Sequence, residues 1–256
     1  MRRLLRLLAA YVRRQLLQWL AWRGFVVTLT LNQAVAPLLG LAVWSAALPG
    51  RAGLSTYYLA LLVVQLMTVS YEQHTLANGI YAGALSDVLL QPRPAVVSTL
   101  AENLALRVWH LLFGLPIIAA AALVAGASPE PGPALLAVPA LALAAGLRFL
   151  FTYLLALSAF WTQQAHGLVG FGGTLLFLLG GAAAPVPLLP DELRPLARAL
   201  PFRSMLGFPA ELASGGLGGG EVLTGYAWQL LWTAVFAVAA ALLWRAGVRR
   251  YTAVGG

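Results

Sequence analysis

The sequence predicts an all-α protein that crosses a membrane several times, and three observations lead to this fold class. Of the 256 residues, 61% are hydrophobic and only 9% are charged, whereas soluble domains are about 45–50% apolar and about 25% charged. The mean hydropathy of +0.83 also excludes intrinsic disorder. Apolar stretches of about 20 residues, the length that spans a bilayer as a helix, recur along the chain. We therefore expect six transmembrane helices, preceded by an amphipathic interfacial helix.

Residues 1–24 form the first segment, which we expect to be this amphipathic helix. On a helical projection its arginines share one arc of about 120°, while leucine, valine and tryptophan fill the other side. The arginines of this arc are Arg2, Arg3, Arg6, Arg13 and Arg14. A helix with two such faces lies in the membrane interface. The alternative, a signal peptide, requires one uninterrupted apolar core, and Arg13 and Arg14 interrupt it.

Residues 25–256 form one membrane domain, and six apolar stretches within it are long enough to span a bilayer. They lie at about residues 25–48, 55–76, 103–126, 134–161, 167–184 and 223–246. The fifth stretch is rich in glycine, so a re-entrant segment is an alternative to a full span there. No internal repeat is visible, which gives little support to a carrier built from inverted repeats.

The arginines predict the orientation of the chain. Cytoplasmic loops of membrane proteins carry an excess of basic residues near the ends of the spans. With the N-terminus in the cytoplasm, ten arginines flank the inner ends of the spans and four flank the outer ends. We therefore expect an even number of spans and both termini in the cytoplasm. The net charge of +8 has the same explanation, so we expect no nucleic-acid partner.

Two connections between spans are longer than simple turns. The first, residues 77–102, lies on the cytoplasmic side. Its apolar residues alternate with small and polar ones, as in a short amphipathic helix, and Pro92 and Pro94 end that helix.

The second long connection, residues 185–222, lies on the outer side. Asp191 and Glu192 near its start, with Arg198 after them, indicate a short helix whose charges oppose its dipole. Its proline, phenylalanine and leucine residues suggest that it partly enters the bilayer. The GGLGGG sequence at its end is typical of a flexible hinge.

The composition excludes several classes of enzyme. All 16 basic residues are arginine, and a P-loop needs a lysine at the β- and γ-phosphates. Cysteine is absent, which removes thiolate ligands and nucleophiles. The three histidines lie far apart, and no Ser-His-Asp set is arranged for catalysis. We expect that the chain is no enzyme, with no catalytic residue, no metal and no bound cofactor.

Charged side chains deep in a membrane indicate function by default. No carboxylate falls near the middle of an expected span, which argues against a proton antiporter. Arg148, in contrast, lies well inside the fourth span. It is a candidate contact for an anionic substrate group in the pathway, or part of a buried pair at a subunit seam. Snorkelling or a bond to neighbouring backbone is the alternative explanation.

Three stretches of the sequence resemble a known family. They are GALSDVLLQPRP at 83–94, the region from LRFLFTYLLALSAFWTQQAHG at 147–167 to LPFRSMLGFPAELASG at 200–215, and RRYTAVGG at 249–256. With the order of an amphipathic helix, two spans, a cytoplasmic helix and four more spans, the chain resembles the permease subunits of type-2 ATP-binding-cassette (ABC) exporters. It is most similar to the subfamily of permeases of about 260 residues.

The resemblance implies a mechanism that depends on partners. A separate ABC ATPase dimer would use ATP and Mg, and a second permease, identical or homologous, would complete the pathway in a bacterial inner membrane. The cytoplasmic helix would be the coupling helix seated in the ATPase. The positions that we carry over to it are Ile80, Gly83, Leu85, Asp87, Leu89, Leu90 and Pro92.

The resemblance also places an outer gate in the second long connection. The gate positions are Pro185, Pro187, Pro201 and Phe202. An apolar pathway with one deep arginine indicates an amphipathic or lipid-like substrate, with membrane lipid as a further contact. Two alternatives are weighed against the exporter: a membrane scaffold, assembly or immunity protein that moves no substrate, and a lipid-modifying enzyme, for which no catalytic set is visible.

Overall fold

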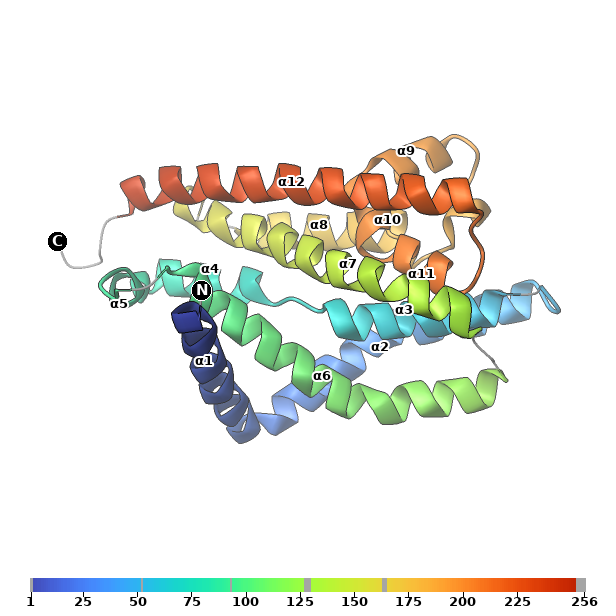
Figure 1. Cartoon of the computed structure of the whole chain (residues 1–256), viewed down its shortest axis with the longest axis horizontal. Coiled ribbons are helices and arrows are strands. Elements are labelled where there is room, and N and C mark those ends of the chain that lie inside the picture. Colours follow the sequence, from blue (N-terminus) through green and yellow to red (C-terminus); the bar gives the residue numbers. More distant parts are fainter. Residues whose placement is uncertain (1, 52, 93, 127–129, 163–164, 252–256) are drawn as a thin grey trace.

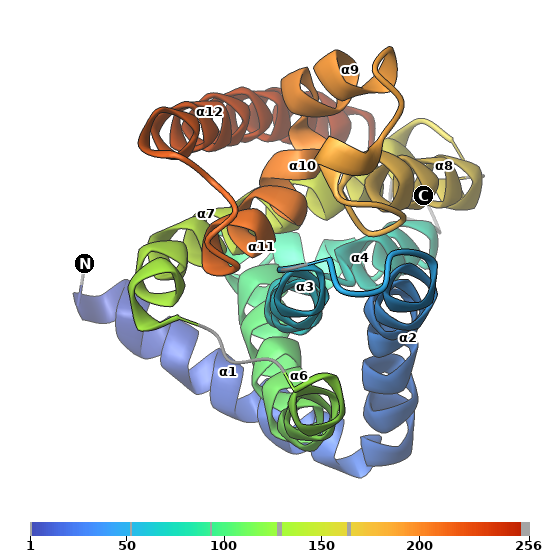
Figure 2. The same cartoon turned by 90° about the vertical axis from the view of Figure 1, so that its right-hand side faces the viewer.

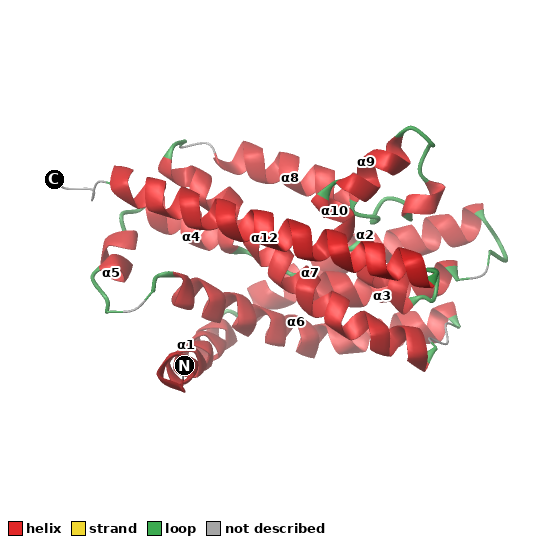
Figure 3. Cartoon of the chain, turned by 45° about the horizontal axis from the view of Figure 1, so that its top comes forward, coloured by secondary structure: helices red, strands yellow, loops and turns green. Residues whose placement is uncertain are grey.

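The computed structural model of the protein describes residues 2–51, 53–92, 94–126, 130–162 and 165–251. These residues form helices joined by turns and loops, and no strand occurs among them (Figure 3). The prediction of an all-α fold is therefore confirmed.

The first helix, α1 (Arg2–Ala21), lies at a steep angle to the long axis of the bundle (Figure 1). It packs against α6 (Val96–Ala125), and the indole Nε1 of Trp109 donates to the carbonyl oxygen of Leu16 at 3.3 Å. The half-buried face comprises Leu8, Val12, Leu16 and Trp19, and Arg6, Arg13 and Arg14 are exposed. The chain thus has the amphipathic helix that was predicted, and its place in the membrane interface stays a prediction.

Five helical segments of the described residues are long and apolar enough to cross a membrane. They are α2 (Arg23–Ala47), α3 (Leu54–Thr68) with α4 (Glu72–Tyr81), α6, α7 (Pro131–Leu157) with the 3-10 turn η1 (Ser158–Phe160), and α12 (Gly219–Arg250). Each coincides with an expected span. Figure 2 shows α3 in the middle of the bundle, surrounded by α2, α6, α7 and α11 (Gly207–Ala213).

The fifth expected span differs from the others. It corresponds to α8 (Ala165–Leu179), whose 15 residues are fewer than the roughly 20 that a bilayer requires. The helix ends early because Gly180 and Gly181 follow it, and Gly181 has a positive φ of 94°. The hydroxyl of Tyr57 donates to the carbonyl oxygen of Gly181 at 2.8 Å and holds this turn against α3. Six full-length spans are therefore not confirmed.

The first long connection is shorter than predicted. Helix α4 continues to Tyr81 and α6 begins at Val96, so only residues 82–95 connect them. Helix α5 (Leu85–Leu89) lies in this connection, at the end of the bundle where α12 also ends (Figure 1). A short helix was expected here, but Ile80 belongs to α4 and not to α5.

The second long connection forms the 3-10 turn η2 (Val186–Leu188) and three short helices, α9 (Leu193–Ala199), α10 (Pro201–Met205) and α11. A short helix with an acidic start was expected, and Asp191 pairs with Arg194 at 2.6 Å beside α9. Helices α10 and α11 lie inside the protein, where Met205 and Phe208 are fully buried. The predicted glycine hinge is shorter than expected, because α12 begins at Gly219.

Helix α12 lies close to α11 at Gly225, because this residue has no side chain. A Cβ atom added at Gly225 would lie 1.9 Å from Cε2 of Phe208. We expect Gly225→Ala to destabilise the protein by about 1–3 kcal/mol, because the buried ring has no free space. Gly146→Ala in α7 is the control, since nothing lies within 4 Å of an added Cβ there. Thermal unfolding in detergent measures both, and equal transition temperatures would contradict this packing.

Candidate functional site

The expected coupling positions divide into anchoring and exposed residues. Ile80 and Leu85 are 6% and 2% exposed and belong to a buried cluster with Ala77 and Ala159. Leu89 and Leu90 are 39% and 85% exposed. Asp87 and Pro92 are exposed as well. Of the expected coupling positions, the exposed ones are therefore those that a partner protein can reach. We call them the tip: Asp87, Leu89, Leu90 and Pro92.

The C-terminal end of α12 holds the tip in place. Gly83 makes the turn before α5 with a φ of 76°, and the hydroxyl of Tyr251 donates to its carbonyl oxygen at 2.7 Å. The same hydroxyl lies 3.1 Å from Oγ of Ser86. Two chain segments far apart in sequence thus brace one short helix, which five residues alone cannot stabilise.

The second span is interrupted within the membrane domain. Helix α3 ends at Thr68 and α4 starts at Glu72, and Val69 between them has an extended backbone (φ −49°, ψ 141°). Residues 69–71 lie outside both helices, so the last carbonyl groups of α3 lose their partners within the helix. In a bilayer such groups require other donors, because no water is available to bind them.

Two side chains of α6 donate to the interrupted segment itself, at Val69 and Ser70. Nε of Arg107 donates to the carbonyl oxygen of Val69 at 3.2 Å, and its Nη2 reaches Oγ of Ser70 at 3.3 Å. Nη2 also donates to the carbonyl oxygen of Ala145 in α7 at 2.7 Å. Nδ2 of Asn103, one turn earlier in α6, donates to Oγ of Ser70 at 3.0 Å. The interruption is thus held by side chains from α6.

Glu72 completes this buried polar cluster. Its carboxylate, in a residue only 2% exposed, accepts a short hydrogen bond from Nδ2 of Asn103 and one from Oγ1 of Thr152 at 2.7 Å. The cluster joins α4, α6 and α7. We call its members the break cluster: Ser70, Glu72, Asn103, Arg107 and Thr152.

Arg148 lies beside the break cluster, on the same face of α7 as Thr152. Its Nη1 donates to Oε1 of Gln65 at 3.1 Å and to Oγ1 of Thr68 at 3.0 Å, and the residue is 7% exposed. Gln65 in turn donates to Gln33 of α2 at 2.9 Å. Arg148 is thus buried within the bundle, where its guanidinium binds side chains of α3. Its place in a substrate pathway stays a prediction.

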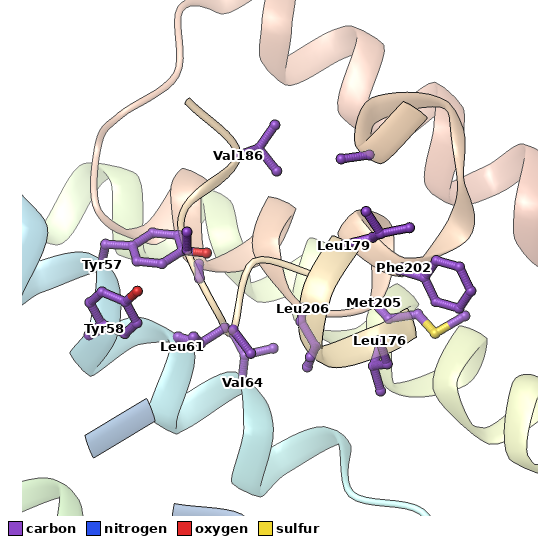
Figure 4. Close-up of a cluster of buried hydrophobic side chains, with 14 of the residues drawn as sticks. Tyr57, Tyr58, Leu61, Val64, Leu176, Leu179, Val186, Phe202, Met205 and Leu206 are labelled. Atoms are coloured by element: carbon purple, nitrogen blue, oxygen red, sulfur yellow. The ribbon is translucent and has the colours of Figure 1, made fainter. Parts of the chain in front are cut away.

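Of the expected gate positions, Phe202 belongs to the main hydrophobic cluster. Phe202 packs with Met205 and Leu206 near Leu176 and Leu179 of α8 (Figure 4). Pro185 and Pro201 are buried, whereas Pro187 is exposed. Arg203 and Glu211 pair within this region, with Nε to Oε2 at 3.1 Å. The connection is therefore an integral part of the bundle at the end opposite the tip.

Two apolar clefts flank the half of α3 that lies away from the tip. The larger, about 800 Å³, lies between α2, α3 and α6 and is lined by residues such as Leu38, Ser45 and Ile117. The smaller, about 400 Å³, lies between α3, α6, α7 and α11 and includes Leu59, Val63 and Ala137. Both have volumes typical of ligand sites and linings that suit hydrocarbon.

Sequence reasoning missed most of the break cluster. The second span was expected to end at about residue 76, whereas α4 continues to Tyr81 and places the buried Glu72 within a helical segment of 28 residues. The signal was the spacing of Asn103 and Arg107, four residues apart and hence on one helix face. No group of metal ligands occurs among the described residues.

The helices and their buried polar groups define a multi-pass membrane protein of the permease class. The comparison with protein families then identifies the chain: it belongs to the ABC-2 family transporter proteins, whose family model matches residues 52–255. No curated protein sequence and no solved structure gives a significant match. The family assignment confirms the resemblance found in the sequence and indicates a transport subunit that works with an ABC ATPase.

The break cluster should be essential for stability. We expect Glu72→Ala to cost about 3–5 kcal/mol, because it removes one of the partners of Asn103 and leaves the two nearby guanidinium groups without a compensating charge. Glu130→Ala removes an exposed carboxylate at the start of α7 and should change stability by less than about 0.5 kcal/mol. Thermal unfolding in detergent compares the two variants. Similar transition temperatures would show that the cluster contributes little.

Proposed function

We propose that the chain is the membrane-spanning permease subunit of an ABC exporter, driven by a separate ATPase dimer that uses ATP and Mg. It forms half of the pathway, and a second permease, identical or homologous, supplies the other half. The observation that carries this proposal is the tip: a short helix anchored on Ile80 and Leu85 that exposes two leucines outside the spans. Without a nucleotide-binding motif of its own, an active transporter needs such a contact.

The distribution of arginines supports an orientation with the tip and both termini in the cytoplasm of a bacterium. Arg249 and Arg250 end α12 close to α5, and the exposed arginines of α1 lie toward the same end of the bundle (Figure 1). Arg51, Arg194 and Arg198 lie toward the opposite end. The excess of basic residues at the tip end is that of a cytoplasmic side.

The apolar clefts and Arg148 support an amphipathic or lipid-like substrate with an anionic group. The clefts offer hydrocarbon surfaces within the spans. Arg148 of α7 lies beside the half of α3 that is nearer the tip, where it binds Gln65 and Thr68. These bonds can be exchanged for bonds to an anion. In this proposal, the segment from Pro185 to Phe202 closes the outer end of the pathway.

The tip predicts where the ATPase binds. Leu89→Asp and Leu90→Asp together should abolish co-purification of the ATPase with this chain, because they place two charges on the apolar contact surface. Leu196→Asp is the control, since this leucine is also exposed but lies in α9 at the opposite end. Retained binding in the double variant would move the ATPase contact elsewhere, for example to α1.

The substrate class has a separate test. We expect dodecyl phosphate to stimulate the ATPase activity of the complex more than the cationic dodecyltrimethylammonium does, since a guanidinium prefers phosphate. Arg148→Ala should remove this preference for the anion and leave the basal ATPase rate in place. Equal stimulation by both amphiphiles, or an unchanged preference in Arg148→Ala, would exclude the proposed role of Arg148.

A further inference from the structure

The interruption at residues 69–71 divides the second span into two parts with different neighbours. Helix α3 packs mainly against α2, α6 and α11, and α4 packs mainly against α7 and η1. Both parts end at this interruption, where Arg107 of α6 donates to the carbonyl oxygen of Val69. Interruptions of this kind permit rotation between the flanking helices, because side-chain bonds are exchanged more easily than a continuous helical ladder.

Helix α4 forms one structural unit with the tip. The hydroxyl of Tyr81 donates to the carbonyl oxygen of Thr162 at 2.9 Å and accepts from the amide of Ala165 at 3.3 Å. Ile80 and Leu85 share the buried cluster that Phe160 and Tyr251 cover. A displacement of α5 must therefore move α4, and the residues that α4 contacts next are those of the break cluster.

We propose that residues 69–71 are a hinge. Asn103 and Arg107 couple movement of the tip across this hinge to α3. This inference rests on the proposed function, in which the ATPase displaces α5. Arg107 suits the role because one guanidinium contacts the break at Val69 and Ser70 and also α7 at Ala145. Asn103 connects the break to Glu72, the first residue of α4.

The proposed rotation of α4 changes the contacts within the break cluster. When α4 rotates about the hinge, the carboxylate of Glu72 moves relative to Asn103 and Thr152, which lie on two different helices. Arg107 then keeps one set of its bonds and exchanges the other, so that no carbonyl group of the break loses its donor. Helix α3 follows, and the clefts that flank it change shape. Asn103 and Arg107 are positioning residues and need not contact a substrate.

The natural absence of cysteine allows a direct measurement of the hinge. Spin labels at Ser55→Cys in α3 and Asn78→Cys in α4 lie on either side of the break, separated by about 35 Å along the helix. Labels at Ala227→Cys and Ala246→Cys form the control pair, because both positions are exposed on the uninterrupted α12. Distances are compared for the complex with its co-purified ATPase, without nucleotide and with Mg-ATP and vanadate.

We expect the Ser55–Asn78 distance to change on nucleotide trapping and the α12 distance to stay constant. Arg107→Lys keeps the charge but loses the planar fork, and Thr152→Val removes the donor to Glu72 and keeps the shape. Both variants should retain the bound ATPase. Because a weakened contact lets α4 move without α3, both should enlarge the change in the Ser55–Asn78 distance. A constant wild-type distance, or a change in both variants equal to that of the wild type, would overturn the proposal. Absence of any ATPase would instead contradict the proposed function.

Discussion

The contact between Arg107 and the broken second span is the interaction on which the rest of the structure depends. A backbone that leaves the helix inside a bilayer must find donors in the protein, and Arg107 and Asn103 of α6 donate to the carbonyl oxygen of Val69. Because these bonds fix α3 and α4 separately, the central helix is positioned between α2, α6 and α11, and α4 carries the tip. The fold therefore combines a helical bundle with an interruption of the second span, which side chains of α6 stabilise.

The two ends of the bundle are built differently. At one end, a short helix exposes leucines and is braced by Tyr251 of the C-terminal segment. At the other end, α10 and α11 fill the space between the spans, and the pair of Arg203 and Glu211 satisfies the charges of that buried segment. One end thus presents a contact surface, and the other is closed by packing. This asymmetry suits a transport subunit that receives force on the cytoplasmic side and opens on the outer side.

The sequence alone predicted the helical class, the amphipathic first helix and the positions of five apolar segments, because apolar length and arginine spacing are local properties. It did not predict the break, since the residues Val69, Ser70 and Tyr71 include no proline or glycine. That interruption results from tertiary bonds with α6. Similarly, Glu211 is buried in α11 as the partner of Arg203, a contact that the sequence alone did not predict. The turn at Gly180 and Gly181 ends α8 before it reaches the length of the expected span.

In the proposed function, this chain is one half of an ATP-driven permease. Purification from its native membrane in mild detergent, with identification and stoichiometry of every associated protein, tests this proposal. We expect a complex of two permease chains with one soluble ABC ATPase chain for each. A complex without a nucleotide-binding partner would contradict it and would favour a membrane scaffold that shares only the fold of the family.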